Sequence, residues 1–339
     1  MTAEKSLSPA GTSDGDPRAG ASRRTWMRRL RFETIGLPVA LVVLCVFLSV
    51  TAPNFATINN VFNILQSASF IGIIAFGMTL VIIAGDIDIS VGSAVALGSA
   101  LLGVLAVNLG LPLWLAVVFV LAEATAFGAL AGFIRARFRV PSFIVTLALF
   151  SALRGLALLI TNGFPIGIPD PAFQFLGAGR IGIVPFPAIL LIAAFLIFWF
   201  ISRKTTFGRT VYAIGGNPEA ARLSGLKVFR TRILIFAITG LLAGFVGVLQ
   251  ASRLASGNPT IATGLEFDVI AAVIIGGTSL AGGRGTMWGT FLGVLLITVL
   301  RNGMVLLGVN PYAQQVFSGA VVLGAVLVSY LRTRNTRES

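Results

Sequence analysis

The sequence predicts an all-α polytopic membrane protein with about ten transmembrane helices, some of them interrupted, and with both termini in the cytoplasm. Hydrophobic residues make up 56% of the 339 residues and charged residues only 11%, which is far from the composition of a soluble domain. Lys and Arg outnumber Asp and Glu by 25 to 12, and they gather in short gaps between apolar runs. In that arrangement the net charge of +13 indicates orientation in a membrane rather than nucleic-acid binding.

The chain begins with a stretch, residues 1–33, that predicts a disordered and basic cytoplasmic tail. Residues 1–22 are rich in Ser, Gly, Pro, Ala and Asp without any period, so they cannot bury enough apolar surface to fold. Arginines are concentrated in residues 23–33, just before the first apolar run. Because that run lacks a small-residue cleavage site, we expect a retained first span with its amino end inside.

Residues 34–332 predict the transmembrane domain, and residues 333–339 a second cytoplasmic tail. The apolar runs long enough to form spans of about 20 residues are roughly 35–52, 61–84, 91–109, 112–134, 141–161, 184–202, 232–251, 267–281, 286–307 and 313–331. With the amino terminus inside, nearly all Lys and Arg fall on the inner side, and only Arg180 and Arg253 fall in outer loops. The run 267–281 is short, so we expect it to tilt, break or lie partly buried.

Two stretches predict interrupted helices. At residues 81–92 the apolar VIIAG gives way to DIDISVG, and at 273–285 VIIGG gives way to TSLAGGRG. Irregular backbone at membrane depth is tolerated only inside protein or along water, which favours a translocation path over an ordinary inner-face turn. Asp88 is expected to cap a helix that begins near Ile89. The candidate residues of the path or its gate are Asp86, Asp88, Ser90, Glu123, Thr278 and Ser279.

Charges within the predicted spans need partners or water. Glu123 lies near the middle of its span, and Arg154 on the next span is its nearest candidate partner by depth. The pair would be either a structural ion pair or part of a pathway. The outer segment 252–268 is polar and would either receive an extracellular ligand carrier or remain a solvated loop. Its candidate contact residues are Arg253, Glu266 and Asp268.

The longest polar interruption, residues 203–232, contains a short helix with both ends marked. Asn217 suits the N-cap, Pro218 the first helical position and Glu219 the positive end of the helix dipole. Gly225 can close the helix in a left-handed conformation. A helix this short is marginal alone in water, so Ala220, Ala221 and Leu223 must pack against something. Either they cover this protein's own membrane ends, or they dock on a separate cytosolic protein.

The sequence contains few of the residues and motifs that catalytic sites use. The chain has one cysteine, Cys45, and no histidine, so disulfides, Cys/His metal sites and histidine acid–base chemistry are unsupported. Residues 177–182 fit G-x-G-x-x-G but follow no predicted strand, and no G-x-x-x-x-G-K-[ST] motif is present. No cofactor or metal is expected, and a membrane-embedded enzyme is disfavoured.

Three stretches together resemble the membrane permease subunits of ribose/xylose-type bacterial ABC importers. They are TTFGRTVYAIGGNPEAARLSGLKV (205–228), ASRLASGNPTIATGLEFDVIAAVIIGGTSLAGGRGT (251–286) and GDIDISVGS (85–93). The likeness covers residues from about 36 to 331. It implies a multi-pass permease in the bacterial plasma (inner) membrane, which forms a homodimer and moves a pentose, hexose, polyol or similar solute.

The resemblance also implies two partners, a cytoplasmic ATPase that hydrolyses ATP and an extracytoplasmic sugar-binding protein. The short helix in 203–232 is similar to the family's coupling element, which inserts into the ATPase. Its coupling residues would be Gly215, Asn217, Pro218, Glu219, Arg222 and Gly225. The alternative is a stand-alone secondary transporter or channel, which would need an ion site of its own, for instance at Asp86, Asp88 or Glu123. The resemblance does not specify the sugar.

Overall fold

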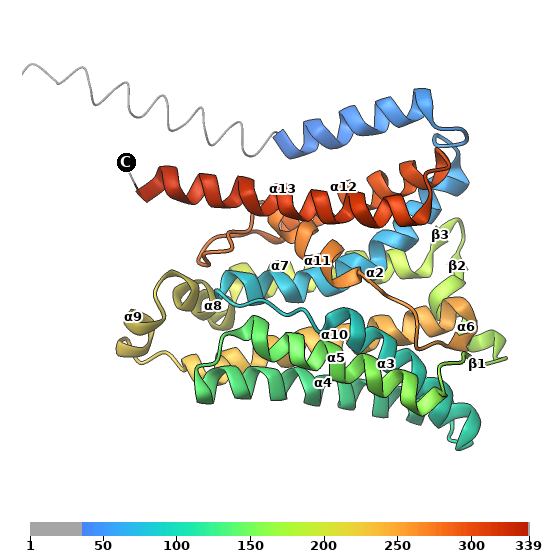
Figure 1. The fold of residues 1–339 in the computed structure, drawn as a ribbon, viewed down its shortest axis with the longest axis horizontal. Helices are drawn as coiled ribbons and strands as arrows, with labels where there is room; N and C mark the ends of the chain where they lie inside the picture. Colours follow the sequence, from blue (N-terminus) through green and yellow to red (C-terminus); the bar gives the residue numbers. More distant parts are fainter. Residues whose placement is uncertain (1–35, 338–339) are drawn as a thin grey trace, which may run out of the picture.

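The computed structural model describes residues 36–337, so the predicted tail at residues 1–33 lies outside the described residues. An apolar helix, Gly36–Thr51, opens the described chain. The later helices are α2 Ile58–Ile83, α3 Val91–Gly103, the π-helix η1 Val104–Asn108, α4 Leu113–Phe138, α5 Ser142–Thr161, α6 Pro171–Ala178, α7 Phe186–Lys204, α8 Thr206–Gly216, α9 Pro218–Leu223, α10 Val228–Leu254, α11 Leu265–Ile275, α12 Met287–Leu306 and α13 Pro311–Arg337. The long helices run side by side, with α8 and α9 at one end of the bundle and α6 at the other (Figure 1).

Seven of the described helices are long and apolar enough to cross a membrane, which makes the chain a polytopic membrane protein. They are α2, α3 with η1, α4, α5, α7, α10 and α12. Each of the ten predicted apolar runs contains a helix, and the shortest run, 267–281, is helical only as far as Ile275. The last helix, α13, continues through Arg337 and so extends into the residues predicted as the second cytoplasmic tail.

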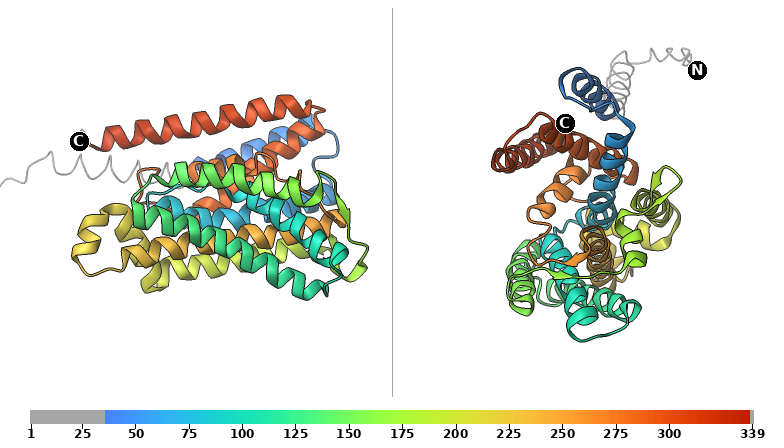
Figure 2. Two further views of the ribbon diagram at one scale, coloured as in Figure 1. Left: turned by 60° about the horizontal axis from the view of Figure 1, so that its bottom comes forward. Right: turned by 90° about the vertical axis from the view of Figure 1, so that its right-hand side faces the viewer.

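Helix α2 lies at the centre of the bundle. It packs against α7, α10, α11 and α12, and most of its residues are buried on every side. The ring of Phe76 lies among the rings of Phe195 and Phe198 on α7, with centroids 5.9 and 6.3 Å away. A helix that is apolar all round is expected in such a position. The end-on view on the right of Figure 2 shows the other helices grouped around this core.

Helices α4 and α10 approach each other closely because glycines face each other across their interface. A Cβ atom on Gly128 would overlap the carbonyl oxygen of Phe236, and one on Gly240 would overlap that of Ala124. Small residues permit such backbone approach in membrane helix pairs. The contact fixes the carboxyl end of α4 beside the amino end of α10, where each helix carries arginine.

Two pairs of short strands tie the end of the bundle near α6. Strand β1 (Ile166–Gly167) pairs antiparallel with β4 (Ser256–Gly257), and β2 (Arg180–Ile181) pairs with β3 (Val184–Pro185). The all-α prediction missed these strands, each of two residues. The β1–β4 pair matters for the site, because it draws the segment after α10 into the protein.

Candidate functional site

The predicted short helix is present as α9, and its amino end is capped as expected. The side-chain oxygen Oδ1 of Asn217 accepts hydrogen bonds from the backbone N–H groups of Glu219 and Ala220, each at 3.0 Å. Pro218 occupies the first helical position. These contacts satisfy N–H groups that have no partner within the helix.

The carboxyl end of α9 closes at Gly225, which has a φ of +78°. The backbone N–H of Leu226 donates to the carbonyl of Ala221 at 3.1 Å, and that of Gly225 donates to Arg222 at 3.0 Å. This is the Schellman arrangement, in which a left-handed residue lets the chain turn back on the last helical carbonyls. The prediction of a left-handed closure at Gly225 is therefore confirmed.

The outer surface of α9 remains uncovered by the described chain. Ala221 is buried, but Ala220 is exposed and Leu223 is 78% exposed. The expectation that all three pack is therefore met within this chain only by Ala221. Glu219 and Arg222 form an exposed ion pair at 2.5 Å, and this contact lowers the pKa of the Glu219 carboxyl. Helix α9 projects at one end of the bundle, as the left side of Figure 1 shows.

Helix α8 links this projection to both interrupted helices. Its Gly215 packs directly on the carbonyl of Ile83, at the end of α2, and on the backbone of Gly283. The N–H of Gly283 donates to that same Ile83 carbonyl at 2.8 Å. The hydroxyl of Tyr212 donates to the carbonyl of Gly285 at 2.8 Å. Three segments that the sequence singled out separately therefore meet at one place.

Asp86, in the first interruption, forms ion pairs with two arginines. Its carboxylate lies 2.6 Å from Nε of Arg135 on α4 and 3.4 Å from Nε of Arg232 on α10. The aspartate side chain is 1% exposed, and the two arginine side chains are 18% and 14% exposed. Asp86 was singled out as a candidate residue of the path or its gate, and the structure pairs it with two arginines of the same chain. The ion pairs attach the turn after α2 to the carboxyl end of α4 and the amino end of α10.

The extended stretch after Asp86 runs along the start of α5. The N–H of Ile87 donates to the hydroxyl of Ser142 at 3.0 Å, and the N–H of Ile89 donates to that of Thr146 at 3.1 Å. Side-chain hydroxyls on α5 thus replace the missing helical partners of this backbone. The unwound stretch is held by protein, which is the condition for irregular backbone at membrane depth.

Asp88 does not cap the next helix as predicted. Helix α3 begins at Val91, two residues later than expected, and Ser90 precedes it. The carboxylate of Asp88 instead accepts hydrogen bonds from the N–H and the hydroxyl of Ser90, at 2.9 and 2.6 Å. It forms a local turn before the helix, and both side chains are buried.

The second interruption carries Thr278 and Ser279. Thr278 is 1% exposed, and its hydroxyl oxygen has no hydrogen-bond partner among the described residues. The backbone N–H of Ser279 donates to the carbonyl of Arg284 at 2.9 Å, which closes the loop on itself. This loop lies against α8 and the end of α2, on the same side as Asp86.

The expected pairing of Glu123 with Arg154 is wrong. Arg154 donates from Nη1 to the carbonyls of Pro259 and Ile261, at 3.0 and 2.8 Å. Glu123 is half-buried, and its Oε2 has no hydrogen-bond partner among the described residues. Arg154 therefore holds the segment after α10, a partner that depth along the spans did not predict.

The polar segment 252–268 is only partly solvated, and it is drawn into the protein at several residues. Gly257 and Pro259 are buried, and Glu266 and Asp268 are 1% and 3% exposed. The placement of Glu266 and Asp268 as surface contacts for a ligand carrier is therefore corrected: both lie inside the molecule, in the first turn of α11. Arg253 lies over the ring of Phe70, 5.4 Å from its centroid.

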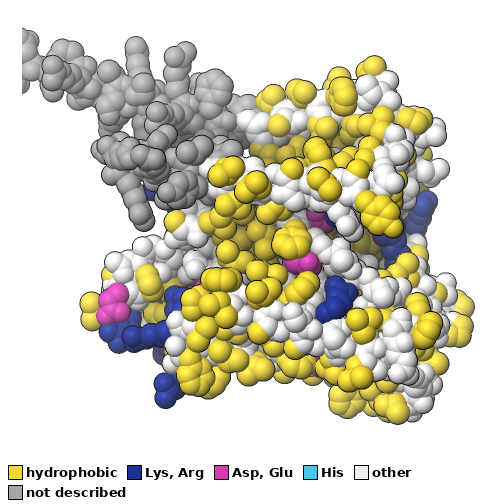
Figure 3. Space-filling model, viewed as in Figure 1, with side chains coloured by type: hydrophobic (Ala, Val, Ile, Leu, Met, Phe, Trp, Pro, Cys, Tyr) yellow, Lys and Arg dark blue, Asp and Glu magenta, His cyan; other side chains and the backbone are white. Residues whose placement is uncertain are grey.

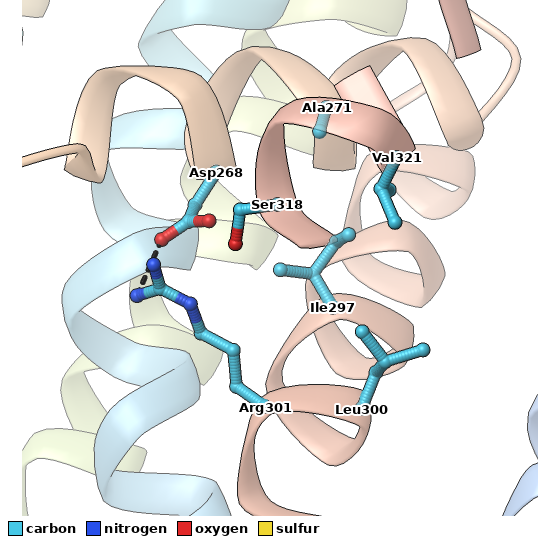
Figure 4. A pocket seen from close by; sticks show the side chains of 7 residues that line it. All are labelled: Asp268, Ala271, Ile297, Leu300, Arg301, Ser318 and Val321. Carbon is cyan, nitrogen blue, oxygen red and sulfur yellow. Dashed lines mark ion pairs between the residues drawn. The ribbon is translucent and has the colours of Figure 1, made fainter. Parts of the chain in front are cut away.

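Asp268 pairs with Arg301, a residue of α12 that sequence reasoning left without a role. The carboxylate lies 2.6 Å from Nη1 of Arg301. Figure 4 shows the pair beside the side chain of Ser318 from α13, with apolar side chains around them. The apolar residues are Ala271, Ile297, Leu300 and Val321. The only sequence signal for this site was an arginine within an apolar run, which indicates a charge that needs a partner but does not identify that partner.

Comparison with known proteins was made against family models and curated sequences. Residues 60–326 match the model of the permease component of the branched-chain amino acid transport system family. The chain is 49% identical to the probable ABC transporter permease protein YphD of Escherichia coli K12, over 90% of this chain and 92% of that protein. It is 45% identical to the ribose import permease protein RbsC of the same organism, over 86% and 91%. It is also 37% identical to the L-arabinose transport system permease protein AraH, over 94% and 97%.

Proposed function

The chain belongs to the family of branched-chain amino acid transport system permease components, and we propose that it is the permease subunit that forms the membrane path of an ATP-driven importer for a sugar or sugar-like solute. The observation that carries the proposal is the similarity to ribose and arabinose permeases over nearly the whole chain. As an ABC permease, the chain is a multi-pass protein of the bacterial inner membrane. It is not itself an enzyme, since a separate ATPase hydrolyses the ATP. The family also implies a substrate-binding protein as a partner.

In the membrane, the permease has ten spans with both termini in the cytoplasm, and it works as a homodimer. The distribution of Lys and Arg supports this orientation. The helix in each of the ten apolar runs supports the number of spans. The end of the bundle with α8 and α9 is then cytoplasmic, and the end with α6 faces outward.

Helix α9 is the element that docks on the ATPase. Its caps hold it as a preformed helix, and its exposed Leu223 offers an apolar contact that the described chain leaves uncovered. Helix α8 transmits the movement of α9 to the membrane helices. Its Gly215 contacts Ile83 at the end of α2 and Gly283 in the loop after α11. The coupling residues are Gly215, Asn217, Pro218, Glu219, Arg222 and Gly225, as the resemblance implied.

Transport follows alternating access, and Asp86 holds the inner gate. ATP-driven closure of the ATPase moves α9 and α8, and these displace the two turns at Ile83 and Gly283. The ion pairs of Asp86 with Arg135 and Arg232 keep the first turn fixed to α4 and α10 until that happens. Asp88, Ser90, Thr278 and Ser279 are further polar residues of the same two turns.

Uptake in proteoliposomes tests this function. The purified permease is reconstituted with its ATPase and the substrate-binding protein, and radiolabelled ribose and arabinose are supplied with or without ATP. We expect sugar accumulation only when ATP and both partners are present. Uptake driven by an ion gradient alone would instead favour a secondary transporter. The first ion site to examine would then be Glu123, whose Oε2 has no hydrogen-bond partner among the described residues.

A further inference from the structure

A group of charged side chains lies in a hollow of the bundle. The hollow opens between α13 and the side of the molecule formed by α5, and acidic and basic side chains are visible in it among apolar ones (Figure 3). Four charged residues lie on the helices of this part of the bundle, α5, α11 and α12: Arg154, Glu266, Asp268 and Arg301. Charges at membrane depth are costly against lipid, so this hollow faces water or protein.

One of these arginines forms an ion pair with a carboxylate of the group: Nη1 of Arg301 lies 2.6 Å from Oδ2 of Asp268. Glu266 lies two residues before Asp268 in the first turn of α11, and Arg154 donates to the backbone carbonyls of Pro259 and Ile261 in the segment before that helix. Two arginines face two carboxylates, so the group has no net charge. A balanced set of this kind offers both hydrogen-bond donors and acceptors without an overall field that favours a cation or an anion.

The Asp268–Arg301 pair lines a small cavity between α11, α12 and α13. The cavity between the pair, Ser318 and their apolar neighbours measures about 10 Å³, which is room for about one water molecule. Arg301 reaches Asp268 across the space between α12 and α11, and its side chain is 36% exposed. No sugar fits through this space while the ion pair is formed.

We propose that Asp268, Arg301 and Ser318 form a gate and a transient binding site for a neutral polyhydroxylated solute within the membrane path. The proposal rests on the function proposed above. In the closed state the carboxylate and the guanidinium satisfy each other. When the helices separate, hydroxyl groups of the solute donate to Asp268 and accept from Arg301, so neither charge is left without a partner.

The lone cysteine of the chain makes a direct test possible without knowledge of the solute. In a Cys45→Ser background, single cysteines are introduced as Ser318→Cys in the gate and Leu196→Cys on the exposed surface of α7. The assembled complex in membranes is treated with a charged, membrane-impermeant methanethiosulfonate reagent. Because the reagent attacks the thiolate and needs an open, water-filled path, we expect Ser318→Cys to react at least about tenfold faster than Leu196→Cys while the complex hydrolyses ATP and the gate opens.

Removal of both charges then tests the gate. The variant Asp268→Asn/Arg301→Gln leaves no unpaired charge, so the protein should fold, and reaction at Ser318→Cys should become several-fold faster. The matched control is Asn60→Ala/Asn302→Ala, which removes a side-chain hydrogen bond of 2.9 Å between α2 and α12 outside the gate. This control should lower thermal stability and leave the reaction rate at Ser318→Cys unchanged.

The outcomes separate this proposal from the importer function. Equal slow reaction at Ser318→Cys and Leu196→Cys would show that no water path passes the pair, and would overturn the proposal. An unchanged rate in Asp268→Asn/Arg301→Gln would remove the pair from the role of gate. In proteoliposomes the same variant should move less sugar per ATP hydrolysed. If the unmodified complex shows no ATP-dependent uptake, the importer function fails, whereas the labelling result stands by itself.

Discussion

Replacement of Gly215 by alanine should uncouple α8 from the two interrupted helices. A Cβ atom at this position would overlap the carbonyl oxygen of Ile83 and lie 2.5 Å from the amide nitrogen of Gly283, where an ordinary contact requires at least 3.4 Å. Both obstacles are backbone atoms, which cannot rotate away as the end of a side chain can. Helix α8 must therefore move off the two turns by about 1 Å.

The cost of this movement has two parts. Overpacking at a tight contact costs about 1–3 kcal/mol, and displacement of the Gly283–Ile83 hydrogen bond of 2.8 Å adds about 1 kcal/mol. Gly216, the next residue, is the matched control, because nothing lies within 4 Å of its Cβ position. Gly216→Ala should be neutral or stabilising by up to about 1 kcal/mol, since alanine is the better helix former.

Two measurements check this pair of variants in the assembled complex. Thermal unfolding should occur several degrees lower for Gly215→Ala than for Gly216→Ala, and ATP hydrolysis stimulated by the loaded binding protein should fall only in the first. In Gly215→Ala, sugar uptake should fall together with the stimulated ATP hydrolysis. The amount of this variant in the membrane should equal that of Gly216→Ala. Equal stability and equal uptake in the two variants would refute the reasoning that α8 transmits movement through this contact.

The remaining predictions concern the tail, the end of α9 and the inner gate. Deletion of residues 2–22 should leave uptake unchanged, whereas deletion of residues 2–31 should lower the amount of inserted protein, measured in membrane fractions, because the positive-inside signal is lost. Gly225→Val should abolish uptake and stimulated ATP hydrolysis together at normal membrane levels, because valine is strongly disfavoured at a φ of +78°, while Ala220→Ser retains both. Asp86→Asn should raise basal ATP hydrolysis of the complex and lower the sugar moved per ATP, because its two arginines lose a buried counter-charge.

Each of these predictions has an outcome that contradicts it. Normal insertion after deletion through Arg31 would count against an inner amino terminus. Full uptake by Gly225→Val would remove that glycine from coupling. If Asp86→Asn leaves both ATP hydrolysis and sugar yield at wild-type values, the ion pairs with Arg135 and Arg232 only stabilise the fold, and the inner gate lies elsewhere.

Helix ends and helix interruptions could be predicted from the sequence, because residues close together along the chain determine them. The ends of α9 follow from Asn217, Pro218 and Gly225, because caps act over three or four residues and leave a pattern in the chain. The interruptions after Ile83 and Ile275 were also visible, since an apolar run that meets glycine and polar residues cannot continue as a lipid-facing helix.

Features that depend on packing between distant helices could not be predicted. The segment 252–268 is polar, and polarity alone predicted a surface loop. The segment is instead partly buried, because strand β4 pairs with β1 and because Arg154 donates to its carbonyls at Pro259 and Ile261. The partner of Arg301 was hidden for the same reason, since Asp268 lies on a different helix and nothing in the local sequence relates the two.

The proposed coupling contact and the proposed gate are joined by a single short helix. Gly276 at the end of α11 leads into the loop that carries Gly283, and Gly283 bonds to the end of α2 beneath α8. At its other end, the first turn of α11 carries Asp268, the acidic half of the gate. An 11-residue helix is about 16 Å long and moves as a rigid rod, so a displacement at Gly283 tilts or shifts Asp268 relative to Arg301 on α12. If this is the route of coupling, Gly215→Ala should also change the rate of reagent reaction at Ser318→Cys, although Gly215 lies far from the gate along the chain.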